Sequence, residues 1–538
     1  MLNSKEAQNK RLKLIWAGIF ALILIGVNIF IFFMTRHWAM KNILAVIMGN
    51  ILMVISASYL VFIYRTAKAV EGMAEEGLNS FYKRSSWILA GLLFVLPFFF
   101  IIWVPDSAHN WDFFQLYRNI TTLKGASFSH LPFTQGYGDL SGLQYYLTYA
   151  NQQFYAIILN RVFGPMTDFF PPIWAMTAVG AALTSASVLA MSNIVKTISE
   201  KKYALLFNVA AFGFWPFIIF GAQLYTDTAS LPFVVFGLLF MVWALRAESL
   251  PKQILFWLLA LVFIFVGYVI KPTVAIVLVA ALIYLLLNKK WKQLLIVLPL
   301  LVVTFFATNS MAKAVIHSEP AFTETANARY NLPLLHWVTM SFAPDNKTGG
   351  YNHAVLEYSM SFEDKTARQT ADRELLIDNL KQEGIGGFLR QLGRKIVYTW
   401  FNGDLNDFFY TYRHANPLIN YFFDYTTWEP NPHVGNITGW LFTRTAQMLY
   451  WLALVPLMWY EIGLSLWRKR KTEWFILGLA VVGLAGFLLI WEANSRYLYN
   501  FTPIMVALAS MGLVDFLKGR RAKKQEKEGA SHANGKTR

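Results

Sequence analysis

The sequence predicts an all-α integral membrane protein with about twelve transmembrane helices and two large segments outside the membrane. Three observations lead to this prediction. Of the 538 residues, 56% are hydrophobic and only 14% are charged, against about 25% charged residues in a typical soluble domain. Several apolar runs reach the ~20 residues that a helix needs to cross the hydrocarbon core. Aromatic residues make up 17% of the chain, which is typical of proteins that anchor helices at membrane interfaces with Trp and Tyr.

The apolar runs place the expected helices along the chain. The first run is too long for a signal-peptide core and lacks a small-residue cleavage site before Arg36, so we expect it to remain as a helix. The run at 273–287 is the weakest, because it is short and follows its predecessor almost without a loop. The expected spans are 14–34, 42–64, 86–104, 172–195, 203–221, 229–245, 253–270, 273–287, 294–311, 441–466, 474–491 and 498–516.

Basic residues predict the orientation, because short cytoplasmic loops are enriched in Lys and Arg. One set of alternate connections is rich in them, as in the run 468–471, whereas the other short connections hold only Arg36, Lys41, Lys271 and Arg496. We therefore expect a multi-pass protein of the cell membrane with both termini in the cytoplasm. Topology then accounts for the net charge of +16, and we expect no nucleic-acid partner. Cys is absent, which excludes disulfides and thiolate metal sites.

This topology predicts the domain organisation. We expect two external segments, of which the second forms a partly water-exposed domain, and a disordered basic tail beside anionic lipid. The parts are an N-terminal two-helix addition (1–85), a transmembrane core (86–311) with a first external loop (105–171), an external loop domain (312–440), C-terminal transmembrane helices (441–516) and a cytoplasmic tail (517–538).

One stretch of the external domain, 363–400, has apolar residues at helical spacing. Glycines near its middle are expected to split it into two helices. The second of these resembles an amphipathic helix that lies at the membrane interface, with basic residues opposed to apolar ones. The glycines are Gly384, Gly386 and Gly387, and the opposed sets are Arg390, Arg394 and Lys395 against Phe388, Leu389 and Ile396.

Ionisable residues near membrane depth are costly, so those at helix ends are candidates for function. They occur in four places on the predicted external face, each beside an apolar run. These are Asp106, with Asp112 after it, Asp227 in a very short loop, Lys271 between two apolar runs, and the pair Glu492 and Arg496 before the last span.

Each candidate also has a simpler interpretation. Asp106 and Asp227 are placed where a helix cap would lie. Lys271 is placed to extend toward lipid headgroups, and Glu492 and Arg496 have the spacing of a local ion pair. Taken together, however, carboxylates and cations emerge on one face from short loops. Such a set suits a reaction in which a carboxylate accepts a proton while Lys and Arg hold the charge of a departing phosphate.

The order and placement of these motifs resemble the GT-C superfamily of polytopic glycosyltransferases, which use polyprenyl-phosphate sugars as donors. The likeness is greatest to cell-envelope members of Gram-positive bacteria and covers 86–516. Two departures are Ala150 in place of the usual Pro, and a first loop Asp that follows the third span instead of the first. The matching elements are Pro105-Asp106, Tyr149-Ala150-Asn151-Gln152, Tyr225-Thr226-Asp227-Thr228, Lys271-Pro272-Thr273, Glu492, Arg496-Tyr497 and Pro503.

The resemblance implies an inverting transfer of a sugar to a cell-envelope glycan or protein outside the cytoplasm. Asp106 would act as general base, and Asp227 would orient the acceptor, the sugar or a divalent cation (Mg²⁺ or Mn²⁺). Lys271 and Arg496 would bind the lipid phosphate. Glu492, Asp112, Tyr225 and Gln152 would support them. No cluster has the spacing of metal ligands, so the residues themselves predict no metal site.

Other functions share some of these features. A polymerase or ligase of lipid-linked glycans would face the same lipid phosphate and would differ chiefly in using an oligosaccharide donor. Twelve spans with cytoplasmic termini are also the layout of many secondary transporters, but those typically have repeated halves and sites near the midplane. A non-catalytic assembly protein is the remaining alternative.

Overall fold

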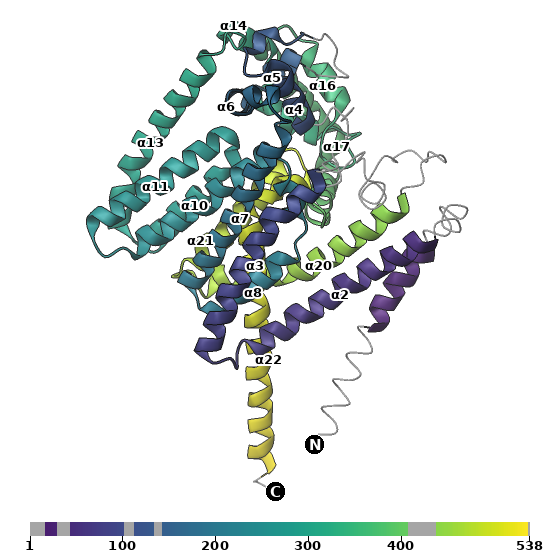
Figure 1. Cartoon of the computed structure of the whole chain (residues 1–538), viewed down its shortest axis with the longest axis vertical. Helices are drawn as coiled ribbons and strands as arrows, with labels where there is room; N and C mark the ends of the chain where they lie inside the picture. The colour runs from purple at the N-terminus through teal and green to yellow at the C-terminus, as the bar shows by residue number, and fades with distance from the viewer. Residues whose placement is uncertain (1–16, 30–42, 102–111, 134–141, 407–436, 536–538) are drawn as a thin grey trace.

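The computed structural model describes residues 17–29, 43–101, 112–133, 142–406 and 437–535. Over these residues the chain is built of helices, and the bridge between Phe133 and Gly142 is isolated. Long helices form most of the molecule, and several of the shorter ones gather at one end of it (Figure 1). The described residues therefore confirm an all-α integral membrane protein.

Eight of the described helices are long and apolar enough to cross a membrane, and each overlaps a predicted span. The total of twelve spans stays a prediction. The eight helices are α2 (Ile43–Ala69), α3 (Glu75–Ile101), α7 (Ile173–Ile198), α10 (Thr226–Arg246), α11 (Leu250–Ile270), α13 (Trp291–His317), α20 (Ile437–Trp467) and α22 (Thr502–Gly535), the last preceded by the 3₁₀ helix η5 (Ser495–Phe501).

The remaining predicted spans are shorter helices. They are Ala17–Ile29, α12 (Ala275–Leu287) with η4 (Pro272–Val274) before it, and α21 (Trp474–Ile490). The prediction of one continuous span over 203–221 was wrong, because α8 (Lys201–Phe212) and α9 (Pro216–Gly221) are separate. Pro216 lacks the N–H that would continue α8, so a break here is expected.

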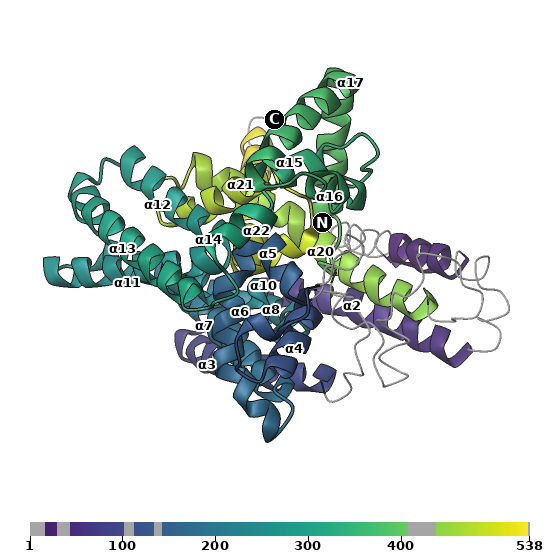
Figure 2. The same ribbon diagram turned by 90° about the horizontal axis from the view of Figure 1, so that it is seen from above.

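Burial separates central helices from peripheral ones. Of the residues in the apolar stretches of α22 and α10, 89% and 72% are buried inside the protein, whereas in α2 and α3 the share is 17% each. Seen from above, α22 lies inside the assembly, while α2 and α13 extend outward on opposite sides (Figure 2). Since a long apolar helix with so little protein cover requires an apolar environment, lipid must cover the outer helices.

Both predicted external segments lie at the same end of the molecule (Figure 1). The first contributes α4 (Asp112–Leu123), α5 (Gly142–Thr148), the 3₁₀ helix η2 (Ala150–Gln152) and α6 (Gln153–Phe163), and the second contributes α14 (Glu324–Tyr330), α15 (Leu334–Ser341), α16 (His353–Met360) and α17 (Lys365–Trp400). The two segments pack on each other, since α14 contacts both α5 and α17.

The predicted split of 363–400 is confirmed. Gly384 has φ +60° and ψ −172° inside α17, a conformation essentially restricted to glycine. The prediction that Lys395 lies on one solvated face with Arg390 and Arg394 was wrong. Lys395 is 1% exposed, whereas neither arginine is buried. Helical spacing instead places it with Gln391 and Thr399, which are also buried.

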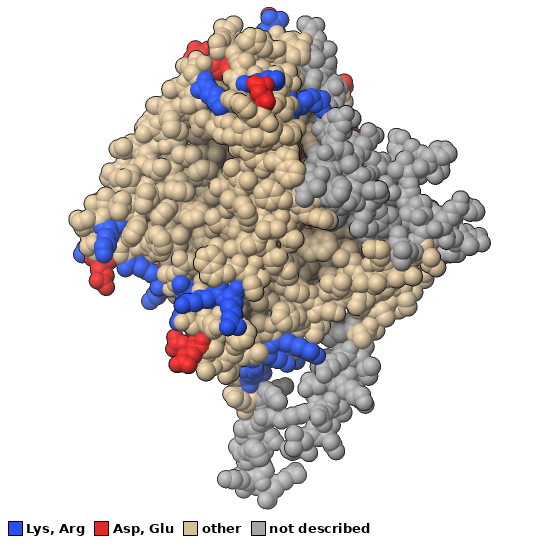
Figure 3. Space-filling model, in the orientation of Figure 1, with Lys and Arg blue, Asp and Glu red and all other residues tan. Residues whose placement is uncertain are grey.

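Charged side chains lie at the two ends of the visible face and leave an uncharged band between them (Figure 3). This band is what a membrane protein requires, since charge in hydrocarbon is costly. The expected disorder of the tail was wrong, because α22 continues to Gly535. The tail is rich in Ala, Lys, Glu, Gln and Arg, which favour helices, and so prolongs α22.

Candidate active site

Three helix ends bring the predicted polar residues together. Asp227 lies in the first turn of α10, and Lys271 is the C-cap residue directly after α11, followed by Pro272. Arg496 lies in the first turn of η5, whose N-cap Asn494 accepts a hydrogen bond from the Arg496 N–H at 3.1 Å. Because each side chain is placed by the end of a helix, their mutual positions are fixed by the packing of the bundle.

Four charged side chains form one cluster, which we call the charge cluster: Asp112, Asp227, Lys271 and Arg496. The Lys271 ammonium donates to Asp227 Oδ1. Arg496 Nε lies 3.5 Å from Asp227 Oδ2, and Arg496 Nη2 lies 3.2 Å from Asp112 Oδ2. Two cations and two carboxylates thus balance in charge. The Asp227 side chain is 1% exposed and that of Asp112 is 30% exposed, so Asp112 is the more accessible carboxylate.

Tyrosines surround the charge cluster. Tyr145 donates a hydrogen bond to Asp112 Oδ1 at 2.9 Å, and Gln152 donates to the Tyr225 hydroxyl at 2.8 Å. The Arg496 guanidinium lies 5.6 Å from the ring centres of both Tyr225 and Tyr497, a cation–π distance. Burial raises the pKa of Tyr145 and Tyr225 well above the ordinary value, so both phenols stay neutral.

Glu492 is a third carboxyl beside the cluster, and like Asp227 it is buried. It is 5% exposed, and its Oε2 accepts a hydrogen bond from the Tyr497 hydroxyl at 2.8 Å. Burial raises the pKa of Glu492 to about 7, against the opposing effects of Tyr497 and Arg496. Near neutral pH this carboxyl is therefore present in both protonation states, unlike an ordinary glutamate.

The structure brings together all of the predicted site residues that it describes, and the proposed base Asp106 lies outside the described residues. The simpler interpretations are corrected at two positions. Asp227 is not the N-cap of α10, because Tyr225 holds that position and Asp227 lies in the first turn. Lys271 is 9% exposed and pairs with Asp227, so it does not extend to headgroups.

Sequence reasoning missed two residues near the cluster. Tyr145 lies in an aromatic-rich segment where one more tyrosine gives no signal. Lys395 reaches the residue before Glu492, since its Nζ donates to the Trp491 carbonyl at 2.7 Å. The spacing of Gln391, Lys395 and Thr399, four residues apart, is the signal that could have revealed a buried polar face on α17.

Among the described residues, no group of three His, Cys, Asp or Glu is placed to hold an ion. In the charge cluster, the two carboxylates already face the cations of Lys271 and Arg496. The chemistry that these residues support is the binding and release of an anion.

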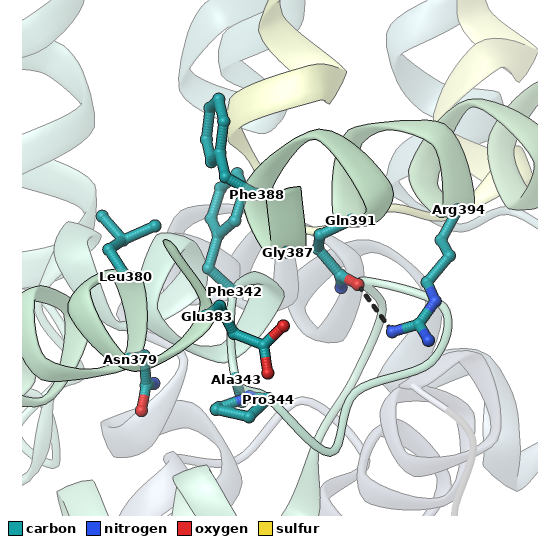
Figure 4. A pocket seen from close by; sticks show the side chains of 10 residues that line it. All are labelled: Phe342, Ala343, Pro344, Asn379, Leu380, Glu383, Gly387, Phe388, Gln391 and Arg394. Atoms are coloured by element: carbon teal, nitrogen blue, oxygen red, sulfur yellow. Dashed lines mark hydrogen bonds between the residues drawn. The ribbon is translucent and has the colours of Figure 1, made fainter. Parts of the chain in front are cut away.

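A pocket of about 260 Å³ lies at the bend of α17 (Figure 4). Among its lining residues, Arg394 donates a hydrogen bond to Gln391 Oε1 at 3.4 Å, and Glu383 lines the same space. Opposite charges line this pocket and it contains none of the predicted site residues, so we do not assign the reaction to it.

Comparison with known proteins gives a family but no activity. A sequence profile described as "conserved hypothetical integral membrane protein" matches residues 5–515. No curated protein and no solved structure matches the chain. The match covers both external segments and every helix that contributes to the charge cluster.

Proposed function

The chain belongs to this family of conserved hypothetical integral membrane proteins, and we propose that it is a membrane glycosyltransferase. It moves a sugar from a polyprenyl-phosphate donor to a cell-envelope glycan or protein outside the cytoplasm. The proposal combines the charge cluster with the resemblance of its motifs to GT-C glycosyltransferases.

The observation that carries the proposal is the convergence of Lys271 and Arg496 on Asp227. Their loops are far apart in the sequence, yet both cations lie within 4 Å of the Asp227 carboxylate. Lys271 brings this site to the end of α11, a helix long and apolar enough to cross a membrane. A phosphate carried by a lipid lies near the level at which such a helix leaves the hydrocarbon. Cations held there bind it strongly, because charge-assisted hydrogen bonds are roughly twice as strong as neutral ones.

The balanced charges suit a resting site. Asp227 compensates the two cations while no donor is bound, since unpaired buried charges would be costly. When the donor phosphate enters, it competes for the same guanidinium and ammonium groups. This exchange favours the leaving phosphate, whose negative charge grows as the bond to the sugar breaks.

The proposed chemistry is an inverting displacement. A carboxylate base takes the proton of an acceptor hydroxyl, whose oxygen then attacks the anomeric carbon. The bond from that carbon to the phosphate oxygen breaks, and the lipid phosphate leaves with the bonding electrons. Asp106 is the proposed base from the resemblance. Asp112, which is partly exposed, and Glu492 lie where they can support the sugar or the acceptor.

The proposed orientation places α4 to α6 and α14 to α17 outside the cytoplasm and both termini inside. The Lys and Arg of the short loops support it. Nucleotide sugars are not available outside the cytoplasm, so a lipid-linked donor suits a site at that face.

A transfer assay tests the proposal. Purified protein in nanodiscs is offered a panel of polyprenyl-phosphate sugars and one lipid-linked oligosaccharide, and release of the lipid phosphate is measured. Turnover of one monosaccharide donor is expected, with a loss of about 100-fold or more in Asp106→Asn, as for a general base. Turnover of the oligosaccharide alone would instead support the polymerase or ligase.

The matched control is Lys124→Met, which removes a lysine whose side chain is 52% exposed and pairs with Asp168 in the first external segment. It is expected to keep wild-type turnover, whereas Lys271→Met should raise the donor KM. Equal donor KM values in the two variants would remove Lys271 from the donor site.

A further inference from the structure

α17 carries a buried lysine to the end of the apolar helix α21. Lys395 is 1% exposed, and its Nζ donates to the Trp491 carbonyl at 2.7 Å and to the Ser341 hydroxyl. Trp491 is the C-cap residue of α21. The last carbonyls of a helix have no partner within it, and a cation at this end is also favoured by the helix dipole. Lys395 therefore caps α21 from the external domain.

The chain leaves room for this lysine. Gly349 has φ +74°, and a Cβ built there would lie 2.4 Å from Lys395 Cγ. The turn that holds Gly349 is fixed by Asn346, whose Oδ1 accepts from the Gly349 N–H at 2.8 Å. One turn before Lys395, Gln391 donates to the Asn346 carbonyl at 2.8 Å, and Figure 4 shows Gln391 on the same helix as Arg394. Lys395 and the turn are thus held by one helix.

The external domain also holds the residues that follow Trp491. The Ala493 N–H donates to the Gly349 carbonyl at 2.8 Å. The Asn494 side chain accepts from Asn406 Nδ2 at 3.0 Å and from the Arg496 N–H at 3.1 Å. The loop 491–494 is therefore bound to the external domain at three of its residues. Arg496, which contacts both carboxylates of the charge cluster, lies two residues further on.

The Ser341 hydroxyl also donates to the Trp491 carbonyl, at 3.4 Å, and such a neutral donor has a lower desolvation cost than a buried ammonium. The adjacent carboxylate of Glu492 favours a charged donor here. It stabilises the ammonium and so opposes the effect of burial, which lowers the pKa of Lys395 to about 7. Lys395 thus contributes a hydrogen bond to the loop and, in its protonated form, a positive charge beside Glu492.

We propose that Lys395 is a positioning residue that fixes the loop 491–494 to the external domain and thereby holds Arg496 ready for the lipid phosphate. The lipid phosphate as ligand rests on the proposed function, whereas the attachment of the loop 491–494 by Lys395 does not. The proposal assigns to the external domain a direct effect on donor binding in the bundle below it.

Hydrogen–deuterium exchange of the full chain in nanodiscs tests the structural part. In Lys395→Met, amides of 491–497 are expected to exchange several-fold faster than in wild type. The control is Lys381→Met on the same helix, whose side chain is 74% exposed. If Lys395→Met does not yield folded protein, Lys395→Gln, which keeps an N–H donor, takes its place. Unchanged exchange at 491–497 in the folded variant would overturn the inference.

Donor kinetics test the functional part. Lys395→Met is expected to raise the donor KM about tenfold, equivalent to 1.4 kcal/mol. Added to Arg496→Gln it should have little further effect, because both changes act on the same contact. Full additivity would overturn the positioning role. Faster exchange together with a wild-type protein that binds no polyprenyl phosphate would support the loop attachment and overturn the proposed function.

Discussion

At the scale of single residues, Glu492 is a carboxyl whose charge changes near neutral pH. Its folded-state pKa of about 7 exceeds the ordinary 4.5, so between these values the folded protein binds more protons than the unfolded chain. Stability therefore falls as pH rises from 4.5 to 7, by up to about 3 kcal/mol at 1.36 kcal/mol per pKa unit. Glu492→Gln should remove this decline from thermal midpoints measured between pH 5 and 8.

The control is Glu363→Gln, at an exposed position of the external domain. It is expected to leave the pH profile of the thermal midpoint unchanged. Parallel profiles for wild type and Glu492→Gln would show that Glu492 does not have a raised pKa in the folded protein.

The pair of Asp227 and Lys271 predicts strong coupling. Asp227→Asn leaves a buried ammonium without its carboxylate, which is expected to cost about 3 kcal/mol of unfolding free energy. Lys271→Met in the same chain should recover part of this loss, because the unpaired charge is then gone. A double-mutant cycle on unfolding in detergent measures the coupling. Strictly additive losses would contradict the ion pair.

These residues also show what sequence can reveal. Asp227 and Lys271 interrupt long apolar runs, so their cost in a membrane makes them visible without a structure. Tyr145 has no such contrast with its neighbours. The partners of Arg496 could not be predicted either, since they depend on how η5 packs against α10. Asp106 lies outside the described residues and stays a prediction.

At the scale of elements, the second half of α17 has its polarity reversed relative to a helix of a soluble protein. Ile385 and Leu389 are 81% and 60% exposed, whereas Gln391 and Lys395 are buried. Periodicity correctly predicted helix over this stretch, but it grouped buried Lys395 with Arg390 and Arg394, which are not buried. It could not show which face packs inward, because a membrane surface favours apolar residues on the outside.

The bend of α17 gives a prediction about backbone strain. Gly384→Ala places a Cβ on a residue at φ +60° and ψ −172°, and the expected cost is about 1–3 kcal/mol. Gly393→Ala on the same helix is the control, since a Cβ there meets nothing within 4 Å. It should be neutral or slightly stabilising. Equal thermal midpoints for both variants would mean that α17 is not bent at Gly384.

At the scale of the whole molecule, the fold class could be predicted because apolar length and the placement of Lys and Arg are properties of the chain itself. The packing order could not. Nothing in the apolar run of α22 distinguishes it from α2, although one is central and the other peripheral. The break between α8 and α9 was missed because Gly213 and Pro216 lie within an otherwise continuous apolar run.

The orientation has a direct test, because the chain contains no Cys. Single cysteines at exposed Tyr351 and Glu374 are expected to react with a membrane-impermeant maleimide in intact cells. Cysteines at exposed Lys289 and Arg470 should react only after permeabilisation. The reverse labelling pattern would place the charge cluster on the cytoplasmic side and remove the argument for a lipid-linked donor.

The central claim is that the charge cluster binds a lipid-borne phosphate, and equilibrium binding of radiolabelled polyprenyl phosphate tests it most directly. The protein is held in nanodiscs of zwitterionic lipid, with Lys271→Met, Arg496→Gln and the control Lys124→Met beside wild type. We predict saturable binding that weakens about tenfold or more in the first two variants, as expected for loss of a charge-assisted contact, and is unchanged in the third. Absence of saturable binding to wild type, or equal affinity in all four proteins, would contradict the account.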